Sequence, residues 1–148
     1  MARRIASRLV RPLTRPLDAV VMVPGSKSIA NRALVCAALA QGRSTFHNLP
    51  DGDDTEAMLT CLAVLGVGVD RDRDGSTATI DGCDGALPPG PLDLPTRLAG
   101  TTSRFITAVA ALGPGPYVID GEPPLRARPM QPLHDALVAL GATVQPRQ

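Results

Sequence analysis

A glycine turn with basic and hydroxyl side chains is the first candidate for chemistry. It spans Pro24 to Arg32 (PGSKSIANR) and leads from an apolar stretch into a helical pattern. Backbone N–H groups at such a helix start, together with the helix dipole, stabilise an anion. Lys27 adds a positive charge and Ser28 a hydroxyl, and Arg32 follows Ser28 by about one helical turn. The segment predicts an anion-binding site; the alternative for Ser28 is a purely structural N-cap.

A second glycine turn has the same character. Ala99 to Arg104 (AGTTSR) places Gly100, the hydroxyl of Thr101 and the cation of Arg104 at the start of another helical pattern. We expect Arg104 on the buried side of that helix. This helix start is a second candidate anion site.

A third helix start is preceded by two cations, in Arg126 to Met130 (RARPM). Because cations oppose the dipole there, a ligand or a carboxylate such as Asp120 or Glu122 must lie beside them. We expect a surface salt bridge for Arg126 and a ligand for Arg128. Three cationic helix starts in one chain predict a cleft for a ligand with several anionic groups, such as a phosphorylated carboxylate.

Other common ligand motifs are not found. Ser26 interrupts a P-loop pattern, and there is no GxGxxG. Asp51, Asp53 and Asp54 form an acidic group that suits a helix N-terminus better than a catalytic or metal site. No carboxylate pair or Ser-His-Asp set is evident.

Composition excludes several function classes. Aromatic residues make up 2% of the 148 residues and the net charge is +1, which argues against nucleic-acid binding. No apolar run approaches the roughly 20 residues of a membrane span. The cysteines lack a CxxC spacing and the two histidines are isolated, so we expect no metal site, no disulfide framework and a cytoplasmic location. These residues are Cys36, Cys61, Cys83, His47 and His134.

The elements that would position these side chains follow from periodicity and turn signals. A mixed α/β fold is predicted. Strands are expected at Ala19–Val23, Ser44–Leu49, Val67–Arg71, Thr77–Asp81, Tyr117–Asp120 and Ala142–Gln145, helices at Ser28–Ala40, Asp53–Leu65, 100–112 and Pro129–Leu140, and a loop at Asp84–Pro95.

The two halves of the chain are weak copies of each other. The GSKS segment with Arg32 is echoed by Gly100 to Arg104, and Leu65-Gly66-Val67 is echoed by Leu140-Gly141-Ala142. A repeat of this length indicates a pseudo-symmetric α/β unit. We expect an Arg-rich leader and strand entry (1–16), a first βαβαββ-like unit (17–83) and a second, incomplete one (84–148). A targeting peptide is the alternative interpretation of the leader.

These motifs resemble the EPSP synthase (3-phosphoshikimate 1-carboxyvinyltransferase) family. PGSKSIANRAL from Pro24 resembles the family signature, and LAGTTSRF from Leu98 and DGEPPLRARP from Asp120 are similar to two further motifs in the same order. The resemblance implies the enolpyruvyl transferase fold, with about two of the three units of one lobe. It also implies transfer of the carboxyvinyl group of phosphoenolpyruvate to the 5-hydroxyl of shikimate 3-phosphate, without a cofactor.

The resemblance assigns roles by position. Lys27 would be catalytic and would touch both substrates, and Ser28 and Arg32 would bind shikimate 3-phosphate. Gly100 and Arg128 would bind phosphoenolpyruvate. Thr101 and Arg104 would support them as members of the GTTSR motif.

The chain departs from the family pattern in places. Leu98, Phe105 and Pro124 stand where the family often has Asn, Pro and Arg. The opposite lobe and its acid–base groups are missing, so we expect a truncated chain with little or no activity alone. The alternatives are a UDP-N-acetylglucosamine enolpyruvyl transferase, which typically has GAKN in place of GSKS, and a non-catalytic module that binds phosphate esters.

Overall fold

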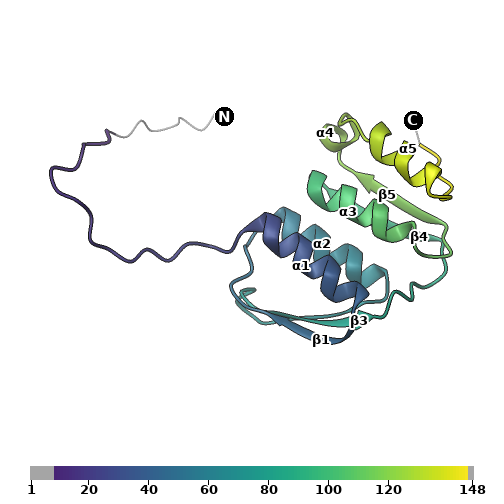
Figure 1. Ribbon diagram of the computed structural model, residues 1–148, viewed down its shortest axis with the longest axis horizontal. Coiled ribbons are helices and arrows are strands. Elements are labelled where there is room, and N and C mark those ends of the chain that lie inside the picture. Colours follow the sequence, from purple (N-terminus) through teal and green to yellow (C-terminus); the bar gives the residue numbers. More distant parts are fainter. Residues whose placement is uncertain (1–8, 147–148) are drawn as a thin grey trace.

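The computed structural model describes residues 9–146, which form a mixed α/β fold (Figure 1). In chain order the elements are α1 (Lys27–Leu39), β1 (Gln41–Phe46), α2 (Asp53–Val64), β2 (Gly68–Arg71), β3 (Ala78–Cys83), β4 (Leu92–Arg97), α3 (Gly100–Ala110), β5 (Tyr117–Gly121), α4 (Pro123–Arg126) and α5 (Gln131–Ala139).

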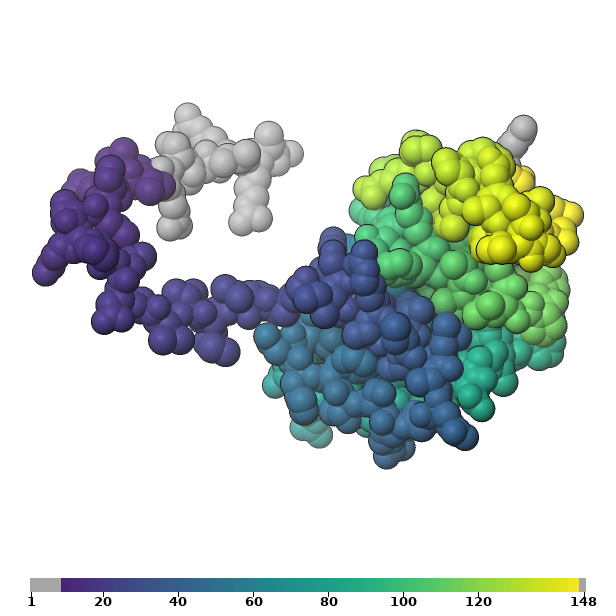
Figure 2. All heavy atoms as spheres, in the orientation of Figure 1, coloured from purple at the N-terminus to yellow at the C-terminus, as the bar shows by residue number. Residues whose placement is uncertain are grey.

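An extended arm precedes α1 and leaves the body of the molecule (Figures 1 and 2). The predicted strand Ala19–Val23 lies in this arm and is wrong, because its backbone has no regular structure. A strand needs a neighbour for its backbone hydrogen bonds, and none of the described strands pairs with it. Val20 is consequently 95% exposed. The first eight residues of the predicted leader lie outside the described residues.

The first sheet is antiparallel, with β3 between β1 and β2. Helices α1 and α2 cover one of its faces (Figure 1). The alternation of β3 explains this arrangement, because Ala78 and Ile80 are buried while Asp81 is exposed. Leu34 of α1 and Leu62 of α2 pack into the same core cluster as Ile80.

The second sheet is a parallel pair, β4 and β5, and α3 makes the connection between them. A parallel pair requires such a crossover, and it places the carboxyl ends of both strands at one edge. Helix α3 packs against both strands and against α2. Ile106 of α3 and Leu94 of β4 join the cluster around Leu34, so one core spans both sheets.

Two predicted helix ends have the same geometry. Gly66 after α2 has φ +83° and Gly141 after α5 has φ +97°. The following N–H groups, of Val67 and Ala142, donate to the carbonyls of Leu62 and Leu137. This is the Schellman arrangement, in which glycine supplies the left-handed residue. The predicted glycine stops at the ends of these two helices are confirmed.

Two other local predictions are wrong. The expected loop Asp84–Pro95 contains most of β4, where the alternate residues Leu94 and Thr96 are buried. Pro95 is tolerated because β4 pairs on one side only. The expected strand Ala142–Gln145 has no regular structure and no partner among residues 9–146. The short helix α4 was not predicted.

Candidate anion-binding site

The first cationic helix start lies where the sequence predicts it. Lys27 is the first residue of α1, and Ser26 occupies the N-cap position without a side-chain cap hydrogen bond. Ser28 is therefore inside the first turn, and the N-cap alternative for it is wrong. The first turn contains no acidic residue, so within this helix no charge offsets the positive end of the dipole.

The preceding turn is fixed by close packing at Gly25. A Cβ atom added there would collide with the carbonyl oxygen of Asn48 and approach the ring of Pro50. The Asn48 amide in turn donates to the carbonyl of Val23. Only glycine lets the loop between β1 and α2 approach the turn so closely. The packing therefore orients the start of α1 relative to α2.

Lys27 is held by an acidic residue of α2. Its Nζ lies 3.0 Å from Oδ2 of Asp54, and the two side chains are 54% and 25% exposed. The backbone carbonyl of Asp54 accepts a 2.9 Å hydrogen bond from Oγ1 of Thr102, a fully buried residue of α3. Asp54 thus connects the starts of α1 and α3, which are far apart in sequence.

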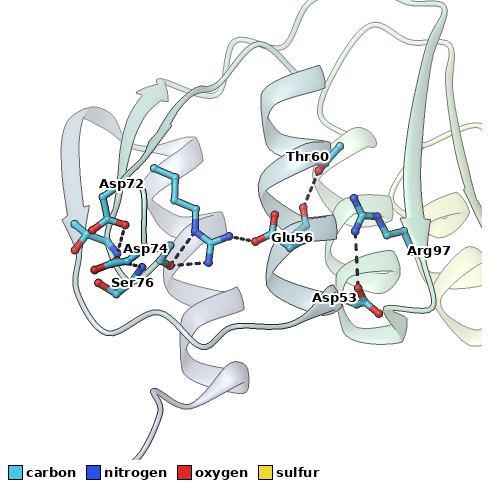
Figure 3. Close-up of polar contacts among 10 residues, drawn as sticks. Asp53, Glu56, Thr60, Asp72, Asp74, Ser76 and Arg97 are labelled. Atoms are coloured by element: carbon cyan, nitrogen blue, oxygen red, sulfur yellow. Dashed lines mark hydrogen bonds and ion pairs between the residues drawn. The ribbon is translucent and has the colours of Figure 1, made fainter.

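The acidic group at the start of α2 is used for ion pairs. The N-cap is Gly52, and no side chain caps the helix. Asp53 points toward Arg97 of β4, with 3.9 Å between Oδ1 and Nη1, and Glu56 pairs with Arg71 on the other side of the helix (Figure 3). The prediction of a helix-start cluster holds for Asp53 and Asp54, but side-chain capping does not occur.

Arg32 is restrained at two points. Its Nη1 donates a 2.7 Å hydrogen bond to the carbonyl of Ser28, one turn earlier in α1. Its guanidinium carbon lies 5.4 Å from the centre of the Phe105 ring on α3. Lys27, Ser28 and Arg32 are the exposed polar residues in the N-terminal half of α1, whose Ala30 and Asn31 are buried.

The second and third helix starts meet in one small cavity. Gly100, Thr101, Arg104 and Arg128 line it, and its volume is about 150 Å³. Gly100 follows β4 and Arg128 follows β5, so the shared edge of the parallel strands brings them together. A Cβ atom on Gly100 would collide with Nη1 of Arg128. The guanidinium therefore lies directly on the glycine.

Arg104 lies on the exposed side of α3, so the expectation of a buried side is wrong. Its Nη2 donates a 3.3 Å hydrogen bond to the carbonyl of Pro129. A charged guanidinium keeps its hydration at the surface and still reaches this carbonyl. The contact ties the segment that carries Arg128 to α3.

The charges around these helix starts are unbalanced. Within residues 9–146, Arg32, Arg104 and Arg128 form no ion pair with a carboxylate, and Lys27 has only Asp54. Arg126 instead forms two hydrogen bonds with Asp120, at 2.9 and 2.7 Å, which raise the pKa of Arg126. The predicted surface salt bridge of Arg126 is confirmed.

The predicted residues fall into two groups. Gly100, Thr101, Arg104 and Arg128 contact one cavity, whereas Lys27, Ser28 and Arg32 lie on α1. No hydrogen bond or ion pair in residues 9–146 joins the α1 group directly to Arg128. Asp54, Thr102 and Phe105 connect the groups, and sequence reasoning gave these three no such role, because their contacts span long separations that no local pattern encodes.

Two structural features of residues 9–146 concern membranes and metals. No helix there is both long and apolar enough to cross a bilayer. No three His, Cys, Asp or Glu side chains gather there in a way that would hold a metal ion.

Comparison with known proteins identifies the same family along nearly the whole chain. The family model described as EPSP synthase (3-phosphoshikimate 1-carboxyvinyltransferase) matches residues 13–148. A 3-phosphoshikimate 1-carboxyvinyltransferase from a Nostoc species is 46% identical over 132 residues, which cover 89% of this chain and 31% of the relative. One from Rhizobium etli is 43% identical over 95% of this chain and 33% of its own length.

The fold agrees with this assignment. A solved structure of EPSP synthase from Acinetobacter baumannii superposes with a TM-score of 0.79 at 26% identity, covering 86% of this chain and 29% of that one. The chain thus spans about a third of the length of its curated relatives. The family model matches far more than half of the chain, and the chain belongs to the EPSP synthase family.

Proposed function

We propose that this chain supplies the anion-binding helix starts at which a 3-phosphoshikimate 1-carboxyvinyltransferase holds its two phosphorylated substrates. The observation that carries the proposal is the cavity in which Arg128 lies on Gly100 beside Arg104. Its two guanidinium groups have no carboxylate partner among the described residues. A guanidinium recognises phosphate and carboxylate oxygens with paired N–H donors.

The roles follow the two groups of residues. Arg128 binds the anionic groups of phosphoenolpyruvate while Gly100 leaves room for its guanidinium, and Thr101 and Arg104 support that cavity. Ser28 and Arg32 bind shikimate 3-phosphate at the start of α1. Lys27 is the catalytic residue of this chain and touches both substrates. Its ion pair with Asp54 keeps the ammonium at the mouth of the turn.

The reaction is an addition followed by an elimination. The 5-hydroxyl oxygen of shikimate 3-phosphate bonds to C2 of phosphoenolpyruvate and loses its proton, while C3 gains a proton. Loss of inorganic phosphate from C2 and of a proton from C3 then restores the double bond. Negative charge is present on both substrates throughout, so cations at fixed positions lower the cost of bringing them together. Proton transfer groups belong to the two-thirds of the family enzyme that this chain does not span, and we expect little turnover from this chain alone.

The remaining expectations belong to the same proposal. We assign residues 17–83 and 84–148 to two related α/β units of one lobe, supported by the similar glycine ends of α2 and α5. We place the reaction in the cytoplasm, in line with the free thiols of Cys36, Cys61 and Cys83. We do not expect the chain to bind nucleic acid or a membrane.

Isothermal titration with each substrate tests the proposal. We expect the chain to bind shikimate 3-phosphate, and Lys27→Ala and Arg32→Ala each to weaken that binding by about tenfold or more, the loss of a charge-assisted hydrogen bond. Arg43→Ala is the matched control, because Arg43 pairs with Asp81 on the exposed face of the first sheet. Unchanged affinity in both site variants would contradict the proposal.

Two other experiments separate this proposal from the sister transferase and from a non-catalytic binding module. Preference for UDP-N-acetylglucosamine over shikimate 3-phosphate would favour the sister enolpyruvyl transferase. Mixing this chain with a family chain that lacks the corresponding region, and then measuring phosphate release, separates a partial enzyme from a binding module. Release of phosphate that disappears in the Lys27→Ala variant supports the enzyme; binding of both substrates without any release supports the module.

A further inference from the structure

The ring of Phe105 lies against the guanidinium of Arg32. The guanidinium carbon of Arg32 is 5.4 Å from the ring centre, within the distance of about 6 Å at which a cation is attracted to an aromatic face. The two residues come from different helices, α1 and α3, and are 73 positions apart, since 105 minus 32 is 73. Phe105 is half-buried and packs against the core cluster, which limits the freedom of its ring.

We propose that Phe105 is a positioning residue for Arg32 and thereby raises the affinity of the α1 start for a phosphate ester. This rests on the proposed function of Arg32. The ring and the carbonyl of Ser28 hold the side chain from two directions. A guanidinium has five N–H donors, and the Ser28 carbonyl accepts from one of them. The others remain for an anion.

An aromatic ring suits this task because it holds a cation without neutralising it. Lys27, five residues earlier, is held by the carboxylate of Asp54, and an anionic ligand must compete with that carboxylate. Arg32 has no carboxylate partner in residues 9–146. Its full charge therefore faces a ligand, while the ring reduces the number of rotamers that binding must freeze.

Phe105 is adjacent in α3 to a residue of the cavity. The preceding residue, Arg104, lines the cavity with Gly100 and Arg128. Successive residues of a helix point about 100° apart, so Arg104 and Phe105 face different neighbours. One turn of α3 thus supports the phosphoenolpyruvate cavity with one residue and the Arg32 side chain with the next.

A ligand-free NMR measurement tests the positioning directly. Protons of a guanidinium over a ring face are shifted upfield by the ring current. We expect this shift for the Arg32 side chain in the parent chain and in Phe105→Tyr, and its loss in Phe105→Leu, which keeps an apolar side chain. The chain has two phenylalanines, so Phe46→Leu is the matched control and should leave Arg32 unshifted relative to the parent. Identical Arg32 signals in the parent and Phe105→Leu would overturn the proposal.

Titration with shikimate 3-phosphate tests the consequence. We expect Phe105→Leu to weaken binding by about 2- to 5-fold, the value of an exposed cation–π contact, and Phe105→Tyr to restore it. In an Arg32→Ala background, Phe105→Leu should have no further effect; an equal loss there would show a general structural effect and contradict the proposal. Failure of the parent chain to bind would contradict the proposed function instead, and the Arg32 shift would still decide whether Phe105 positions that side chain.

Discussion

Gly100 offers a substitution that should weaken ligand binding without lowering the free energy of unfolding. It is the first residue of α3 and its backbone does not require glycine, since its φ is not positive. The obstacle to a side chain is the Arg128 guanidinium, which a Cβ atom would strike. Because the atom that it would strike, Nη1 of Arg128, is the end of a flexible side chain, Gly100→Ala should displace Arg128 and leave the backbone in place.

The magnitudes follow from these two effects. A charge-assisted hydrogen bond contributes about 1.5–3 kcal/mol, so displacement of Arg128 should weaken phosphoenolpyruvate binding by about 10- to 150-fold. Alanine in a helix is favoured over glycine by roughly 0.5–1 kcal/mol, less at a first position. The free energy of unfolding should therefore stay the same or rise slightly.

Titration calorimetry and urea unfolding measure the two quantities on the same variant. Arg128→Ala provides the control background, in which Gly100→Ala should cost no further affinity. An unchanged affinity for phosphoenolpyruvate in Gly100→Ala would refute the contact between Gly100 and Arg128 as the basis of the cavity. A large loss of stability would refute the claim that only the guanidinium moves.

Two further predictions concern stability. Thr102→Val removes the hydroxyl that donates to the carbonyl of Asp54 and should lower the free energy of unfolding by about 1 kcal/mol, seen as a lower urea midpoint; an unchanged midpoint would contradict a role for this bond. Burial raises the pKa of Cys61 to about 11, so the folded state keeps its thiol protonated while the unfolded thiol ionises at lower pH. The contribution of this thiol to the free energy of unfolding should be full below its unfolded pKa and decline as pH rises toward 11, and Cys61→Ala should reduce that decline. The exposed Cys36 should react with iodoacetamide before the buried Cys61. Equal reaction rates for the two thiols would contradict the burial of Cys61.

Local patterns predicted the helices of this chain well. The periodic apolar residues and glycine stops place α2 and α5 within a few residues of their observed bounds, because a helix satisfies its hydrogen bonds within one segment. Strands were less predictable for the opposite reason. The apolar residues of Ala19–Val23 suit a strand but have no described neighbour to pair with. The proline in β4 argues against a strand there, and only the pairing of β4 with β5 accounts for it.

The candidate site likewise has features that are local in the sequence and features that depend on packing. The positions of charged residues at helix starts could be predicted from the sequence, because the glycine turns before Lys27 and at Gly100 and the proline after Arg128 are local features. The contacts that hold these charges come from the tertiary packing. Parallel pairing of β4 with β5 brings Arg128 onto Gly100. Helix packing gives Arg32 the ring of Phe105 and Lys27 the carboxylate of Asp54. Contacts between residues so far apart in the sequence depend on how the whole chain packs, so local sequence patterns do not predict them.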